Sequence, residues 1–286
     1  MPSLIDIRRR IRSVRNTQQI TKAMKMVSAA KLRRAQDRVI AGRPYAALIR
    51  KVLANLAVAV ESDDKAAANP LLARRPEGRI LLLLFTSDKG LAGAFNANLI
   101  KAAQKFTEEH ANAEIELETI GRKGRDFFRK RGARIVAEHI GILNAPRFED
   151  AAAIARQAID RFRNGEIDAV YLLNNEFKSM VAQRLSVGRL LPVEVPPGAE
   201  VVDYIFEQPP NQMLESLLPR YVEAEVYRSM LETGAAEHAA RMMAMEAATS
   251  NASEMIDTLT LYMNRVRQAS ITKEIIEVVS GAAAAE

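Results

Sequence analysis

The stretch "LIDIRRRIRSVRNTQQITKAMKMVSAAKLRRAQDRV", residues 4–39, decides the fold because its apolar residues recur with the period of a long helix. Steps of three and four residues give one heptad series: Leu4, Ile7, Ile11, Val14, Gln18, Thr21, Lys25, Ser28, Leu32, Ala35 and Val39. Apolar heptads of this kind are typical of a coiled-coil seam. The middle of the series is polar, and the apolar residues there shift to Ile20, Met24 and Val27. The sequence therefore predicts that the apolar stripe drifts around the helix.

A second, longer heptad series follows the two prolines at 209–210. Its members are Leu214, Leu217, Tyr221, Ala224, Arg228, Leu231, Ala235, His238, Met242, Met245, Thr249, Ala252, Ile256, Leu259, Met263 and Val266. Pro219 is expected to kink its first turns, and the Gly-Arg-Pro segment at 42–44 is expected to interrupt the first helix before it resumes over 45–60. Together the two series predict a long antiparallel coiled coil between the ends of the chain.

Charge is distributed unevenly along the chain and supports this pairing. Residues 1–55 hold 14 basic and 2 acidic residues, residues 56–206 hold 21 of each, and residues 207–286 hold 6 basic and 12 acidic residues. The basic first helix therefore has an acidic partner within the same chain. A composition of 48% hydrophobic and 27% charged residues is typical of a core-forming protein. The absence of cysteine excludes disulfides and thiolate metal sites.

The middle of the chain has a different pattern, in which strand-like apolar runs alternate with amphipathic helices. Strands are predicted at 79–85, 114–120, 134–137 and 168–174, helices at 96–109, 122–130 and 150–163, and a last strand within 180–191. This β-α-β alternation predicts a Rossmann-like α/β domain with a mostly parallel sheet, inserted into the coiled coil. The predicted limits are residues 1–60 for the first helix, 61–78 for a linker, 79–206 for the α/β domain and 207–286 for the second helix.

Two segments offer alternative functions. The turn "FTSDKGLAGAFNANL", residues 85–99, lies between a strand and a helix, where phosphate-binding loops occur, so a nucleotide-binding protein is one alternative. It matches neither glycine-rich fingerprint, and a tight turn in which Gly90 and Gly93 supply backbone freedom is the favoured interpretation. The run "RRRIRSVRN", residues 8–16, makes a basic coiled-coil nucleic-acid-binding protein the other alternative.

Candidate catalytic groups are few. His110, His139 and His238 lie far apart in the sequence, and none has a second residue at metal-ligand spacing. No nucleophile with a positioned base is recognisable. No window reaches the roughly 18 uncharged apolar residues of a membrane-spanning helix. These features predict a protein with neither a cofactor nor a catalytic site of its own.

Four stretches resemble, in order, the signature segments of one family, the gamma subunits of F-type ATP synthases. They are "IRSVRNTQQITKAMKMVSAAKLRRAQ" at 11–36, "TSDKGLAGAFNANL" at 86–99, "ARMMAMEAATSNASEMI" at 240–256 and "RQASITKEIIEVVSGAAA" at 267–284. With the helix, α/β domain, helix order, the resemblance covers essentially the whole chain. It implies a rotor shaft of the bacterial type that couples rotation of a membrane ring to ATP synthesis or hydrolysis in other subunits.

The resemblance also implies partners and a location. The partners are the alpha and beta subunits of the catalytic hexamer, the epsilon subunit and the proteolipid rotor ring, with no nucleic acid bound. The location is the cytoplasmic face of the bacterial inner membrane, as a peripheral subunit. Because the chain begins directly with the shaft helix, a bacterial or already processed protein is expected.

Carried over to matching positions, the resemblance implies two sets of contact residues. The coupling contacts to catalytic subunits are Lys22, Met24, Lys25, Arg241, Arg267, Gln268, Thr272 and Glu274. The membrane-ring contacts are Tyr204 and Glu207, within "DYIFEQPP" at 203–210, a segment that is otherwise interpreted as a linker. Packing in the seam explains Met24 equally well. The apolar tip "ITKEIIEVVSGAAAA", residues 271–285, suits a bearing, because fixed salt bridges would hold a turning shaft in one orientation.

Overall fold

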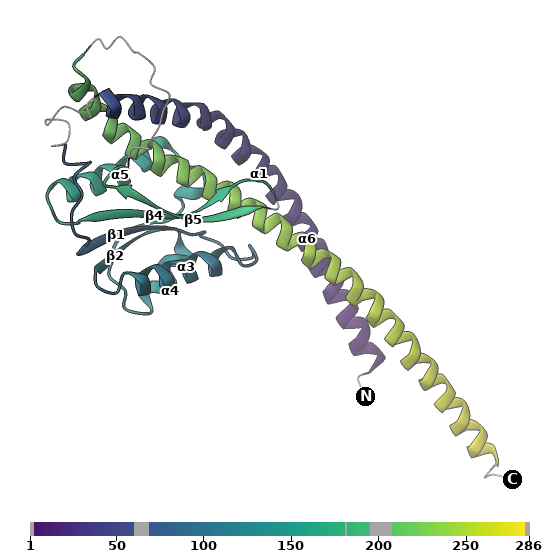
Figure 1. Ribbon diagram of the computed structural model, residues 1–286. Coiled ribbons are helices and arrows are strands. Elements are labelled where there is room, and N and C mark those ends of the chain that lie inside the picture. The colour runs from purple at the N-terminus through teal and green to yellow at the C-terminus, as the bar shows by residue number, and fades with distance from the viewer. Residues whose placement is uncertain (1–2, 60–68, 181, 195–207, 284–286) are drawn as a thin grey trace. The chain divides into compact units, whose positions relative to one another are not determined.

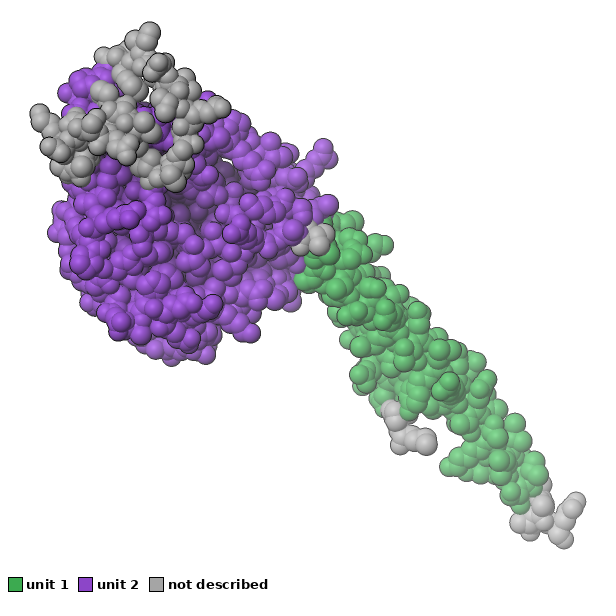
Figure 2. All heavy atoms as spheres, viewed as in Figure 1, with its two compact units in different colours: residues 1–28, 241–286 green, residues 29–240 purple. Residues whose placement is uncertain are grey.

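The computed structural model describes residues 3–59, 69–180, 182–194 and 208–283 of the chain. It divides into two compact units (Figure 2). Unit 1 combines residues 1–28 with 241–286, and unit 2 spans residues 29–240. Both divisions fall inside long helices, α1 (Leu4–Ala59) and α6 (Pro210–Ala283).

The centre of unit 2 is a five-stranded sheet (Figure 1). Its strands are β1 (Arg79–Phe85), β2 (Glu114–Ile120), β3 (Ile135–His139), β4 (Ala169–Phe177) and β5 (Gln183–Leu191). The order is β3-β2-β1-β4-β5, and only β5 runs antiparallel to its neighbour. The remaining described elements are α3 (Phe95–Glu109), α4 (Arg122–Arg129), a short 3₁₀ turn (Ile142–Asn144) and α5 (Phe148–Arg163). The predicted mixed α/β fold with a mostly parallel sheet and helical ends is confirmed.

The central strand β1 shows why this sheet is covered on both faces. Its sequence RILLLLF is apolar and buried from Ile80 onward, as expected for a parallel strand with helices on either side. Leu81, Leu83 and Phe85 pack with α5 and with the parts of α1 and α6 in unit 2. Ile80, Leu82 and Leu84 pack with α3 and α4.

The predicted interruption of the first helix is wrong, because α1 continues through Pro44. A proline inside a helix removes one hydrogen bond and costs about 3 kcal/mol. The residues beyond it offset this cost by packing: Ala46, Ile49, Leu53 and Leu56 recur at helical spacing and are all buried. Tertiary packing therefore outweighs the local sequence signal.

The predicted drift of the seam in the first helix is also wrong. Ile20 and Val27 are 60% and 57% exposed, whereas Thr21 and Ser28 of the strict heptad series are buried. Within unit 1, the hydroxyls of Thr21 and Thr249 are hydrogen-bonded at 2.8 Å. Polar side chains therefore keep the seam position because they find partners there, and the apolar residues are left on the outer surface.

Candidate functional site

The first group of predicted coupling residues lies in unit 1, where α1 and α6 run antiparallel. Lys25 forms an ion pair with Glu246, and its side chain is 41% exposed. Lys22 is exposed, and Met24 is half-buried beside the seam. Arg241 is only 9% exposed, so it belongs to the packed side of α6. We call these four predicted residues the Lys25 patch.

The second group lies farther along α6 and is exposed throughout. Its members Arg267, Gln268, Thr272 and Glu274 form what we call the Arg267 patch. The Thr272 hydroxyl donates to the Gln268 carbonyl at 2.9 Å. The hydroxyl of Ser270 donates to Glu274 at 3.3 Å. The exposed side chains of Arg267 and Gln268 are accessible to a partner.

The structure does not bring these two patches together. Glu246, the partner of Lys25, precedes Arg267 by 21 residues on the same helix. At about 1.5 Å per residue, this spacing corresponds to roughly 30 Å along α6. The predicted coupling residues therefore form two separate surfaces.

An apolar surface adjoins the Arg267 patch toward the end of α6. It consists of Ile271, Ile275, Ile276, Val278 and Val279, which are 48–72% exposed. Large aliphatic side chains gathered on an exposed helix mark a contact surface. The charges among them are paired locally, since Lys273 lies 3.5 Å from Glu277. We call this set the apolar tip.

The turn after β1, the candidate phosphate loop, is held by internal bonds. The Asp88 carboxylate accepts from the backbone N–H of Arg122 and of Gly141, each at 3.0 Å. The backbone N–H of Ser87 donates to the Asn96 side chain at 2.9 Å. A carboxylate of the chain itself thus occupies the N-terminus of α4, where a bound anion would otherwise be placed. This arrangement favours the structural-turn interpretation.

The sequence predicts that Gly90 and Gly93 supply the backbone freedom of this turn, and the structure differs from this prediction at one of the two residues. Gly93 has a positive φ of 56°, as expected, but the other positive φ in the turn belongs to Leu91, at 62°. Leu91 rather than Gly90 therefore carries the left-handed conformation. Its side chain is 64% exposed.

Tyr204 and Glu207, the predicted membrane-ring contacts, lie outside the described residues. The sequence analysis missed a partly buried cluster of charges in unit 2, formed by Arg50, Glu225 and Arg228. The sequence signal that could have revealed this cluster is the recurrence of glutamate within the span 222–239 of α6, where most other residues are apolar or small.

Comparison with known proteins identifies the family. A family model described as ATP synthase matches residues 3–285. The ATP synthase gamma chain of Solibacter usitatus is 70% identical over 286 residues, covering all of both chains. That of Anaeromyxobacter sp. (strain Fw109-5) is 50% identical and covers 99% of each chain. The chain belongs to the ATP synthase gamma chain family.

Solved structures agree with this membership. A chain in the central stalk and c-ring structure of Tetrahymena thermophila mitochondrial ATP synthase has 26% identity and a TM-score of 0.62, covering 80% of this chain and 99% of that chain. A chain of the Euglena gracilis mitochondrial enzyme, at 17% identity with a TM-score of 0.67, shares the fold over 98% of this chain and 94% of its own. The protein is thus a central-stalk subunit of a bacterial-type F-type ATP synthase, and this role replaces the two alternative functions. Among the described residues, no helix has the length and apolar character to cross a membrane.

Proposed function

We propose that this gamma-family chain couples rotation to catalysis through the two separate patches of unit 1, while its apolar tip serves as a bearing. The observation that carries the proposal is the exposure of the whole span 271–281, apolar residues included. Exposed aliphatic side chains bind a partner without directional bonds, so they permit rotation. The paired charges of Lys273 and Glu277 leave few fixed contacts for the surrounding sleeve.

The Arg267 patch supplies the directional contacts. Its guanidinium, amide and carboxylate groups are exposed and form hydrogen bonds that depend on distance and angle. Such contacts differ between the conformations of a catalytic subunit, and a difference in binding energy between conformations is what shifts their populations. The partners in this proposal are the alpha and beta subunits of the catalytic hexamer.

The Lys25 patch has a more limited role in this proposal. Lys22 is exposed and available to an acidic loop of a catalytic subunit, while Lys25 is already paired with Glu246. Met24 contributes both to the seam and to the adjoining surface. Arg241 supports the patch from its buried position.

The proposal includes two further partners, the proteolipid rotor ring and the epsilon subunit. In this proposal Tyr204 and Glu207 contact the ring, and the epsilon subunit binds the chain as a further partner. The complex places the chain on the cytoplasmic face of the inner membrane as a peripheral subunit. The chain itself binds no cofactor and carries no catalytic site.

The test uses the chain assembled with its alpha and beta subunits, with Mg-ATP hydrolysis as the readout. The variant Gln268→Ala/Thr272→Ala should lower the hydrolysis rate at least 3-fold, because it removes contacts made by the Arg267 patch. Thr258→Ala is the matched control, since Thr258 is exposed and bonds the Glu254 carbonyl at 2.9 Å, as Thr272 bonds Gln268. Equal rates in the variant, the control and the unaltered complex would reject the role of the patch.

A further inference from the structure

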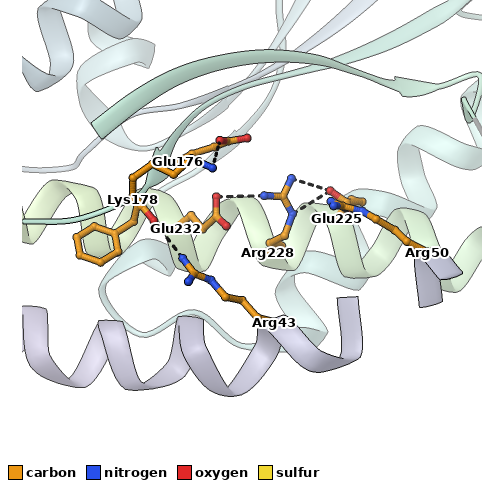
Figure 3. Close-up of polar contacts among 8 residues, drawn as sticks. Arg43, Arg50, Glu176, Lys178, Glu225, Arg228 and Glu232 are labelled. Carbon is orange, nitrogen blue, oxygen red and sulfur yellow. Dashed lines mark hydrogen bonds and ion pairs between the residues drawn. The ribbon is translucent and has the colours of Figure 1, made fainter. Parts of the chain in front are cut away.

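A partly buried ionic network links the two long helices inside unit 2 (Figure 3). At its centre, Arg228 of α6 donates to Glu225 at 2.8 and 3.0 Å and to Glu232 at 3.1 Å. The side chains of both glutamates are only 8% exposed. We call Arg43, Arg50, Glu225, Arg228 and Glu232 the ionic joint.

Two arginines of α1 connect this centre to other elements. Arg50 donates to Glu225 at 2.6 and 3.1 Å and so joins α1 to α6. Arg43 donates to the Phe177 carbonyl at 3.2 Å and so joins α1 to the end of β4. The two arginines are seven residues apart and therefore lie on one face of α1. Three elements thus meet at one set of charges.

Two arginines of the joint, Arg50 and Arg228, have raised pKa values because of the glutamates that they contact. Burial lowers the pKa of Arg50, but attraction by Glu225 outweighs it and the pKa lies above its ordinary value. The same balance of burial against Glu225 and Glu232 raises the pKa of Arg228. Arg50 and Arg228 therefore stay charged throughout the physiological range.

Two further bonds extend the connection between α6 and the α/β domain. Arg156 of α5 donates to Glu223 at 2.7 Å. The Gln183 side chain of β5 donates to the Ala236 carbonyl at 3.0 Å. Helix α6 is thus tied to elements of the sheet and its covering helices at successive turns, by bonds with fixed direction.

We propose that the ionic joint is the torque-bearing connection through which the α/β domain turns α1 and α6. Apolar packing holds these helices against the domain, but it is non-directional and resists sliding weakly. Charge-assisted hydrogen bonds have preferred distances and angles, so they resist rotation of a helix against its support. The inference rests on the proposed coupling function and adds the residues that carry load within the subunit.

A cavity beside the joint explains why directional bonds are needed there. It has a volume of about 230 Å³, and its walls include Tyr45, Phe148 and Tyr227 together with Arg43 and Arg228. The side chains of the two helices therefore do not interlock completely at this level.

The test compares Arg43→Met/Arg50→Met with Lys51→Met in the complete ATP synthase reconstituted in vesicles. Methionine keeps an unbranched apolar stem, and Glu225 retains Arg228, so the centre of the joint stays paired. Lys51 is exposed on the same helix and serves as the matched control. The readout is the ratio of ATP-driven proton uptake to ATP hydrolysis, measured in the same vesicles.

The expected result is hydrolysis within 2-fold of the unaltered enzyme and proton uptake reduced at least 3-fold, with the Lys51→Met ratio unchanged. Arg50→Lys keeps the charge but loses the forked guanidinium donor, so it should give an intermediate ratio. If the double variant fails to assemble, the ratio of Arg50→Lys tests the proposal in its place. If the Arg50 variants keep the ratio of proton uptake to hydrolysis of the unaltered enzyme, the torque-bearing role of the joint is rejected, and the proposed function is not affected. Absence of coupled hydrolysis in the unaltered complex would overturn the proposed function, and the joint with it.

Discussion

Along α6, nearly every residue of the span 222–239 is buried, whereas every residue of the span 271–281 is exposed. The buried span carries four glutamates, and the exposed span carries five large aliphatic residues. Hydrophobicity alone would therefore assign the two spans to the wrong surroundings. The buried charges are tolerated because arginines and a network of hydrogen bonds satisfy them.

The difference teaches how one helix serves two purposes. In the span 222–239, packing against the sheet and α1 stabilises the helix and fixes its position. In the span 271–281, helix formation depends on local bonds, and the large aliphatic side chains are 48–72% exposed. Such a surface is explained by a partner outside the chain.

The largest expected effect comes from removing equal bulk at the two spans. Met230→Ala, at a residue with no exposure, should lower the free energy of unfolding by about 2–5 kcal/mol. Ile276→Ala, at a residue that is 59% exposed, should change it by less than about 0.5 kcal/mol. Urea unfolding followed by circular dichroism measures both. Similar losses at the two sites would show that the tip is packed within the chain.

An intermediate effect concerns the pH dependence of the buried span. Burial raises the pKa of Glu232, and attraction by Arg228 opposes this only in part. Below the ordinary value of 4.5 the carboxyl is protonated in both folded and unfolded chains. Between the ordinary value and the raised pKa, the Glu232 carboxyl is ionised in the unfolded chain but still protonated in the folded chain. The free energy of unfolding therefore falls as pH rises through this interval.

Glu232→Gln should remove this fall. The free energy of unfolding of the variant, minus that of the unaltered chain, should therefore increase as pH rises above 4.5. Urea unfolding at a series of pH values measures the trend. Glu254→Gln, at an exposed residue of the same helix, is the control. An identical trend in both variants would contradict the assignment to Glu232.

Much of the fold could be predicted from the sequence because period and alternation are local signals. No residue of either heptad series is exposed, and the strand β1 was assigned with the bounds that the structure has. The errors arose where distant partners decide the outcome. Pro44 is accommodated by packing of later residues, and Thr21 keeps its seam position because Thr249 lies opposite.

The candidate site was predictable only as a list of positions on two helices. The distance from Lys22, Met24 and Lys25 to the Arg267 patch could not be predicted, because it follows from where α1 lies beside α6. The ionic joint was missed for a related reason. A glutamate in an apolar helix face is interpretable only when the arginine that pairs with it, such as Arg50, is known to lie opposite.

The smallest expected effect compares two glycines within long helices. In Gly42→Ala, the added methyl group would lie 3.6 Å from the Leu231 side chain, which is ordinary contact. Replacing glycine by alanine inside a helix stabilises it by about 0.5–1 kcal/mol, so the variant should unfold at higher urea. In Gly281→Ala, the methyl group would meet nothing within 4 Å.

Gly281 lies close to the end of α6, where helices fray, so its replacement should change the free energy of unfolding by less than about 0.3 kcal/mol. The comparison is sharp because both substitutions add the same group to the same kind of backbone. A gain at Gly281 equal to that at Gly42 would mean that the exposed end of α6 is as firmly helical as the packed part of α1. The tip would then differ from the packed part of α1 only in the exposure of its side chains. The bearing role would be supported by its exposed apolar surface and not by a weaker helix.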